Sequence, residues 1–206
     1  MKKILVFALV LVPAVAHADG SIGVRAGTLG LGVEAAYPIS GSLGVRLTAD
    51  GYRYSRKFTQ DNIDYDGDAT LRTASLLIDL FPFANNFRIS AGGVYNGNKL
   101  LLSTPMTSLK IGNNTYNAQL NGEVDFKKFA PYAGIGYGRP VNSGLSLTFD
   151  LGVMFQGTPT ATLNGTCTGT CTNFQTDLAA QEASLNDKIK DFRYYPVATL
   201  GLAYTF

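Results

Sequence analysis

The last thirteen residues, Tyr194 to Phe206, constrain the fold of this chain more than any other segment. Side chains alternate along them with a period of two, as in a β-strand. One face carries Phe206, Tyr204, Leu202, Leu200 and Ala198, and the other carries Thr205, Ala203, Gly201 and Thr199. The first face suits lipid and the second suits a narrow interior. The alternative is an edge strand of a soluble β-sandwich.

The first 18 residues have the pattern of a secretory signal peptide. Lys2 and Lys3 precede an apolar run from Ile4 to about Val15, and small residues flank His17 before Asp19. The run is shorter than the roughly 20 residues that span a bilayer. We expect Sec-type export with cleavage before Asp19, so that residues 1–18 are the signal and residues 19–206 form one domain.

The remaining composition limits the classes of protein that are possible. Without Lys2 and Lys3 the chain carries equal numbers of basic and acidic residues, so the basic footprint of a nucleic-acid-binding protein is absent. No stretch of 18 apolar residues follows the signal. If the chain lies in a membrane, it must therefore do so as a closed β-barrel, because only helices and closed barrels satisfy every backbone polar group in lipid.

Further two-residue alternations, bounded by turn signals near residues 40, 84 and 142, predict seven clear strands. An eighth, short strand is expected near Ser21 to Ala26, because the alternation changes parity at Gly27 and Thr28, which indicates a tight turn or a bulge. The predicted fold is all-β: an eight-stranded antiparallel up-and-down transmembrane β-barrel with a short helix in the last outer loop.

Aromatic residues gather near both ends of the expected strands, as they do at the two interfaces of a bilayer. One group is Tyr37, Phe81, Phe83, Phe87, Tyr204 and Phe206, and the other is Tyr52, Tyr54, Tyr95, Phe129, Phe155, Tyr194 and Tyr195.

In its signal peptide, strand pattern, aromatic groups and terminal Phe206, the chain resembles the small bacterial outer-membrane β-barrels of the OmpA-like, OmpX-like and OmpW-like superfamily. The resemblance implies a location in the outer membrane of a Gram-negative bacterium, in contact with membrane lipid and lipopolysaccharide. It also implies that Tyr204 and Phe206 form a signal read by the barrel assembly machinery during insertion. We expect a monomer.

Charged side chains alternate with the apolar ones and should face the interior. They are Arg25, Glu34, Arg46, Asp50, Asp79, Arg88 and Asp150. Buried charges are costly unless they are paired, and the interior of an eight-stranded barrel is only wide enough for side chains. We therefore expect a lumen largely closed by charge pairs. The alternative is a narrow, porin-like conduit for small solutes.

Several glycines share this inward face, among them Gly134, Gly136 and Gly152. The missing side chains could leave a cavity, or they could let large neighbours such as Arg46 and Tyr132 pack closely.

The sequence holds no recognisable catalytic set. Its only histidine is His17, inside the expected signal peptide, whereas the enzymes among small outer-membrane barrels rely on a histidine base. Cys167 and Cys171 are the only cysteines, and their spacing without histidine is poor for zinc. An oxidising compartment favours a disulfide between them, the alternative being two free thiols. We expect no enzyme, no metal and no cofactor.

Three outer loops are expected. The first, Asp61 to Asp68, gathers four acids, which are either simply solvated or contact a divalent ion or lipopolysaccharide. The second, Ser103 to Asp125, should form a hairpin through Gly112 to Asn114. The third spans Thr158 to Phe192.

A helix is expected in the third loop, starting at Thr176 or Asp177, because four apolar residues there share one helical face. They are Leu178, Leu185, Ile189 and Phe192. The helix should lie over the barrel mouth or against the hairpin, and a partner-binding helix is the alternative. Together these features predict a structural or surface-interaction protein.

Overall fold

The computed structural model describes residues 20–60, 63–140 and 143–206. The expected signal peptide and its cleavage point before Asp19 lie outside these residues. The described chain contains twelve antiparallel strands and one helix.

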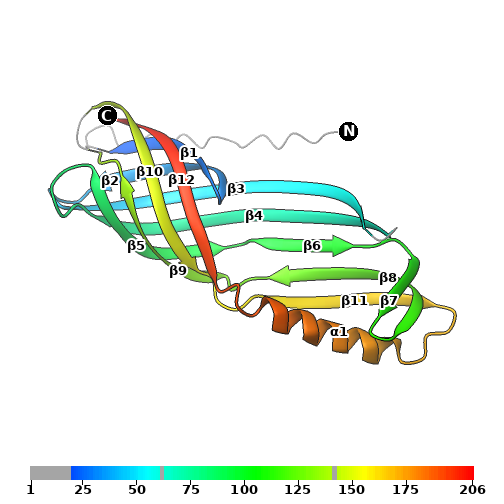
Figure 1. Ribbon diagram of the computed structural model, residues 1–206. Coiled ribbons are helices and arrows are strands. Elements are labelled where there is room, and N and C mark those ends of the chain that lie inside the picture. Colours follow the sequence, from blue (N-terminus) through cyan, green and yellow to red (C-terminus); the bar gives the residue numbers. More distant parts are fainter. Residues whose placement is uncertain (1–19, 61–62, 141–142) are drawn as a thin grey trace.

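Eight strands pair into a closed ring (Figure 1). The first strand pairs with the last, Ser21 opposite Thr205, and the ring closes between the fourth and fifth strands, Leu80 opposite Ile89. Its members, in ring order, are β1 (Ser21–Gly27), β2 (Gly30–Pro38), β3 (Leu43–Gln60), β4 (Ile63–Leu80), β5 (Phe87–Asn96), β9 (Phe129–Tyr137), β10 (Gly144–Phe155) and β12 (Tyr194–Thr205).

The short first strand occurs where the change of parity predicts it. β1 and β2 pair as far as Gly27 opposite Gly30, so Thr28 and Leu29 form a two-residue turn. Gly30 adopts φ 106°, a conformation that side chains other than glycine rarely accept. The expected turns near residues 40 and 84 join β2 to β3 and β4 to β5 at one end of the ring, where β9 also ends and β10 begins. We call this the turn end. Residues 141 and 142 of the third expected turn lie outside the described residues.

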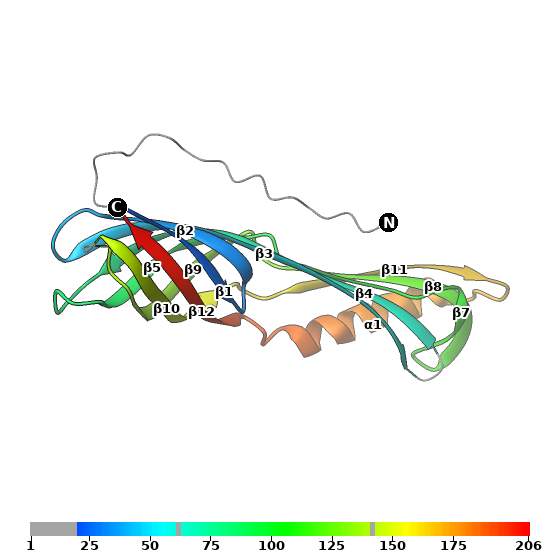
Figure 2. The ribbon, with the colours of Figure 1, turned by 90° about the horizontal axis from the view of Figure 1, so that it is seen from above.

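At the opposite end, β3 and β4 continue far beyond the ring, and further strands extend the same sheet there; we call this extension the arm (Figures 1 and 2). The strand order in the arm is β3-β4-β6-β8-β11. The added strands are β6 (Lys99–Ser103), β8 (Asn114–Asp125) and β11 (Thr160–Thr168), and β7 (Thr107–Ile111) forms a hairpin with β8. The hairpin turns at Gly112, φ 61°, as the sequence predicts.

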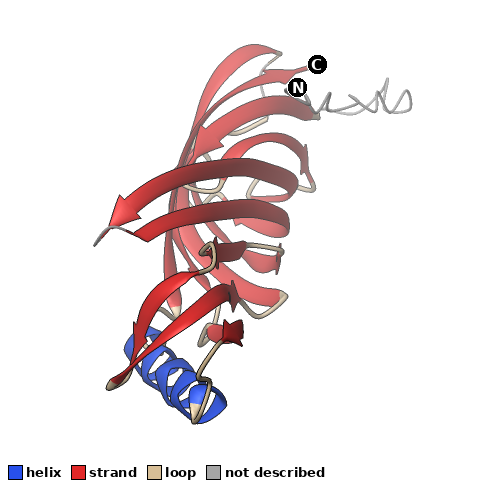
Figure 3. Cartoon of the chain, turned by 90° about the vertical axis from the view of Figure 1, so that its right-hand side faces the viewer, coloured by secondary structure: helices blue, strands red, loops and turns tan. Residues whose placement is uncertain are grey.

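The helix α1 (Phe174–Ile189) packs mainly on β11 and also on β7, along the outer edge of the arm (Figure 3). It buries Phe174 and Leu178 against Leu109, Tyr116 and their neighbours in the arm's own apolar core. The helix therefore belongs to the arm.

Four details differ from the sequence predictions. The helix begins at Phe174, two or three residues earlier than expected, and Phe192 lies beyond its end, 65% exposed. The acidic segment is no loop from Ile63 onward, because it forms the start of β4 and pairs with β3. Asp61 lies outside the described residues. Finally, β11 occupies part of the predicted third loop.

Candidate functional site: the interior of the ring

All seven charged residues that the sequence places inside the ring are buried there, on six different strands. Arg46 is the most enclosed, with 1% of its surface exposed. Because successive side chains of a strand point to opposite faces, alternate residues of each strand face the interior. The layer lies in the half of the ring nearer the turn end, and it holds one more carboxylate than guanidinium.

Arg46 links opposite walls of the ring. Its Nε donates to Asp79 Oδ2 on β4 at 2.8 Å, and its two terminal nitrogens donate to Asp150 on β10 at 3.0 and 3.1 Å. Ser90 Oγ accepts a further hydrogen bond from Arg46 and donates one to Asp79. Charge-assisted, bidentate contacts of this kind are the strong class of protein hydrogen bonds.

Asp150 is shared between two guanidinium groups. Arg88 on β5 donates from one terminal nitrogen to both Asp150 oxygens at 2.9 Å. Its other terminal nitrogen donates to the backbone carbonyl of Gly138 at 2.7 Å. One carboxylate therefore ties β3, β5 and β10 together.

Arg25, Glu34 and Asp50 form a looser group on β1, β2 and β3. Arg25 Nε lies 3.0 Å from Asp50 Oδ1, and its Nη1 lies 3.7 Å from Glu34 Oε2. Although these are ion-pair distances, the same Arg25, Glu34 and Asp50 atoms make no aligned hydrogen bond among the described residues. This side of the charged layer is thus the less tightly held one.

A second layer, towards the arm, is apolar, and the sequence analysis missed it. Its core is Leu29, Leu77, Val94, Ala130, Tyr132, Met154 and Val197, with Tyr195 packed against it. Met154 and Ala130 have no exposed surface. The two-residue alternation could have revealed this layer, because Leu77 lies two residues from both Ser75 and Asp79 and therefore shares their inward face.

The inward glycines make room for large neighbours. A Cβ at Gly134 would lie 2.5 Å from the Tyr132 hydroxyl, and one at Gly152 would also collide with that ring. A Cβ at Gly136 would lie 2.7 Å from Asp150 Oδ1. Close packing, rather than a cavity, is what these positions provide.

Arg139 joins the turns at the turn end. It donates to the backbone carbonyls of Ala84 and Gly41, in two different turns, and stands over the Phe81 ring at 5.4 Å. Phe81 is 2% exposed, so it faces inward and is not one of the outward aromatics that the sequence suggests. Tyr195 also turns inward, and its hydroxyl donates to the carbonyl of Thr28 at 2.5 Å.

The other predicted site residues lie away from this interior. Cys167 and Cys171 form a disulfide between β11 and α1, with Cα atoms 5.9 Å apart. Tyr204 projects outward and is 52% exposed, and the Phe206 amide donates to the carbonyl of Gly20. Their role as an assembly signal stays a prediction. No group of three or more potential metal ligands occurs in the part of the chain that the structure describes.

Side chains of α1 satisfy the free edge of β11. Asn186 exchanges two 2.8 Å hydrogen bonds with the backbone of Ala161, and Glu182 accepts one from the Leu163 amide at 2.7 Å. Exposed strand edges are sites of unwanted pairing. The helix therefore protects the last strand of the arm.

Asp177 anchors the start of the helix to the β7–β8 hairpin. It accepts hydrogen bonds from the Asn114 amide and the Tyr116 hydroxyl, both at 2.7 Å. These two donors hold the pKa of Asp177 below its usual value, and the same contact raises the pKa of Tyr116.

The face of the arm that points away from α1 is charged. Lys99 donates to Glu123 and also lies 3.7 Å from Asp125. The hydrogen bond from Lys99 lowers the pKa of Glu123, while the hydrogen bond with Glu123 raises the pKa of Asp125. Ser55 donates to Asp68 on the same face.

Among the described residues, no helix is both long enough and apolar enough to cross a bilayer. The sequence matches no protein-family model, and no curated protein matches it either.

Solved structures do resemble this fold. CarO2 of Acinetobacter baumannii aligns with a TM-score of 0.63 and 20% identity, over 91% of this chain and 98% of CarO2. CarO of the same organism aligns with a TM-score of 0.62 and 20% identity, over 92% of this chain and 98% of CarO. A major outer membrane protein from Thermus thermophilus aligns with a TM-score of 0.45 and 17% identity, over 92% of this chain and 100% of that protein. The chain thus shares its mostly antiparallel β fold with CarO2 and CarO.

Proposed function

We propose that this chain is an integral outer-membrane β-barrel of a Gram-negative bacterium, reached by Sec-type export, with a closed lumen and an arm that makes contacts at the cell surface. The observation that carries the proposal is the filled interior: a charged layer centred on Arg46 and Asp150, followed by an apolar layer around Met154. In this proposal the eight-stranded ring spans the membrane and the arm lies outside it.

The exterior of the ring supports membrane insertion. Large apolar side chains project from every strand, and Leu145 (74%), Leu31 (64%) and Val24 (61%) are among the most exposed. In water such a belt would be unfavourable, because each of these side chains is worth about 1.5–3 kcal/mol on burial. Exposed aromatics near the strand ends, including Tyr37, Tyr95 and Tyr194, suit the two interfaces.

The two interior layers support a closed lumen for different reasons. Solute passage through the charged layer would require Arg46 to leave two carboxylates at once, and a buried charge without a partner is costly. Passage through the apolar layer would separate side chains that are already in contact. The alternative, a narrow conduit for small solutes, draws on the looser Arg25 group, which is where water would enter most readily.

The remaining expectations belong to the same proposal. The protein has no catalytic role and needs no cofactor, it works as a monomer, and its partners are membrane lipid, lipopolysaccharide and, during insertion, the barrel assembly machinery. Membership of the OmpA-like, OmpX-like and OmpW-like superfamily is part of the proposal as well.

Two measurements test the proposal in turn. The folded protein, extracted from outer membranes, should migrate differently in a gel before and after heating, and recovery as a soluble protein would contradict a barrel. Insertion into a planar bilayer should then give no sustained conductance, and a stable open level would favour the conduit.

A further inference from the structure

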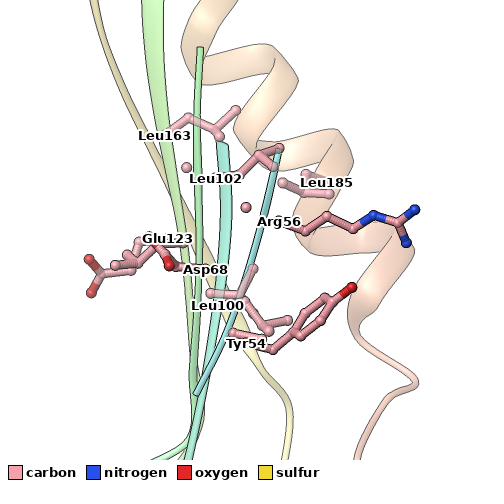
Figure 4. A pocket seen from close by; sticks show the side chains of 13 residues that line it. Tyr54, Arg56, Asp68, Leu100, Leu102, Glu123, Leu163 and Leu185 are labelled. Atoms are coloured by element: carbon pink, nitrogen blue, oxygen red, sulfur yellow. The ribbon is translucent and has the colours of Figure 1, made fainter. Parts of the chain in front are cut away.

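The face of the arm that is turned towards α1 carries an apolar groove of about 610 Å³ (Figure 4). Leu100 and Leu102 of β6 form its floor, Leu163 of β11 and Leu185 of α1 form one side, and Tyr54 and Arg56 of β3 form the other. Leu100 and Leu102 are 43% and 42% exposed, so the floor is open to solvent. The volume lies within the usual range of about 300–1,000 Å³ for small-ligand sites.

Small residues create the hollow. Gly67 and Ala69 of β4 and Gly122 of β8 stand on the same face as the floor leucines, as the register shows. A Cβ at Gly122 would lie 3.2 Å from Leu163 Cδ2. Larger side chains at these positions would fill the groove, which would otherwise be an ordinary sheet surface.

Three charged residues border the groove, Arg56, Asp68 and Glu123, and the two acids already have partners. Arg56 makes no ion pair with any described residue, and Figure 4 shows its guanidinium on the same side as the Tyr54 hydroxyl. The two acids beside the floor, Asp68 and Glu123, belong to the opposite face, where they bind Ser55 and Lys99. An anionic group is therefore the complementary partner at the β3 end.

The floor offers no backbone hydrogen bonds. β6 is paired on both sides, with β4 and with β8, so its amides and carbonyls are already used. A peptide laid across the floor would leave its own polar backbone unpaired, which is unfavourable, whereas a hydrocarbon chain has no such groups. A second copy related by a twofold axis would bring a second Arg56 towards the first.

We infer that this groove binds a free single-chain amphiphile with an anionic headgroup, of the long-chain fatty acid class, with the carboxylate at Arg56 and the chain running towards Leu163 and Leu185. From β3 to β11 the groove crosses four inter-strand steps, about 19 Å in all, which suits an extended long acyl chain. The inference rests on the proposed position of the arm outside the membrane, and it does not depend on whether the lumen conducts.

The test uses the full mature chain in phosphatidylcholine bilayer discs, with radiolabelled palmitate as the probe and empty discs as the partition background. We expect saturable binding at one site, strengthening about fourfold for each methylene buried as the chain is lengthened from octanoate to palmitate. Non-saturable uptake equal to that of empty discs would overturn the inference. Conductance of the same preparation is measured separately, so that failure of the closed lumen and failure of the groove remain distinguishable.

Two exposed apolar residues of the arm supply matched variants. Leu102→Gln places an amide in the groove and should weaken palmitate binding at least tenfold, whereas Met106→Gln, at an exposed position that does not line the groove, should leave it unchanged. Gly122→Leu fills the groove without adding a polar group and should likewise weaken palmitate binding at least tenfold, which guards against a folding defect in Leu102→Gln. Equal palmitate binding by all three variants would overturn the inference. So would dimerisation of the protein without palmitate, if Leu102→Gln and Gly122→Leu both removed it.

The headgroup is tested at Arg56. Arg56→Gln should weaken palmitate binding about tenfold, the value of one charge-assisted hydrogen bond, and leave hexadecanol binding unchanged. Lys57→Gln, the neighbouring cation on the opposite face, is the control. An equal loss for palmitate and hexadecanol, or no loss for either, would contradict a carboxylate at Arg56.

Discussion

The guanidinium of Arg46 and the carboxylate of Asp150 lie 3.0 Å apart inside the ring, although 104 positions separate them in the sequence. One is on β3 and the other on β10, and these strands are not neighbours. The contact therefore spans the interior, and it brings together walls that no backbone pairing joins.

Removing Asp150 should be strongly destabilising. Asp150→Ala leaves the buried Arg88 without an ion-pair partner among the described residues and removes one of the two carboxylates that Arg46 binds, so we expect the free energy of unfolding to fall by about 3–5 kcal/mol. Urea unfolding in lipid vesicles, followed by the gel shift on heating, measures the change. Asp66→Ala breaks the exposed pair with Lys57 and should cost about 0–1 kcal/mol. Equal losses for the two variants would show that the interior network is not a stabilising centre.

The apolar layer can be tested with two adjacent leucines of β4. Leu77 is 4% exposed and Leu76 is 55% exposed. Leu77→Ala should lower the free energy of unfolding by about 2–5 kcal/mol through the cavity it leaves. Leu76→Ala, on the outer face, should have a much smaller effect. The same unfolding assay decides, and the reverse order would contradict the placement of the layer.

The edge contact between α1 and β11 predicts a local effect. Asn186→Ala removes both hydrogen bonds to Ala161 and should lower the free energy of local opening by about 2 kcal/mol. Hydrogen exchange at the Ala161 amide is the measurement. Asp187→Ala, one residue further along the helix, should not change this amide, and protection that survives Asn186→Ala would mean that the helix does not seal the strand.

Attachment of the helix should depend on acid pH. Because its folded pKa is lowered, Asp177 contributes stability that is complete above its unfolded pKa of about 3.9 and is lost as pH falls through the folded value. Hydrogen exchange of the first turns of α1 should therefore accelerate below about pH 4. Asp177→Asn should show fast exchange already at neutral pH, with little further change on acidification. A wild-type profile without an acid limb would contradict the anchor.

The ring could be predicted from sequence because one face of each strand is apolar and the other is small or charged. That contrast gives the period of two, and it placed Arg46 and Asp150 inside before their contact was known. Leu77 was harder to interpret, since an apolar residue on the inward face looks like a break in the pattern rather than a second layer.

The arm was less predictable for physical reasons. Beyond Asp50, β3 carries polar or aromatic side chains on both faces, so its continuation to Gln60 has no alternation. The helix starts after Asn173, which has φ 65° and makes no side-chain cap. The start signals at Thr176 and Asp177 therefore place the beginning of the helix two or three residues too late. The groove depends on strands distant in sequence and could not be foreseen from any one of them.

Conductance in planar bilayers tests the closed lumen most directly. Wild-type protein, with insertion verified by the gel shift on heating, should show no sustained current. A triple variant that removes large side chains from both interior layers, Arg46→Gly with Tyr132→Gly and Met154→Gly, should conduct, which would show that the assay can detect an open lumen. Stable single-channel conductance of the wild-type protein would contradict the account.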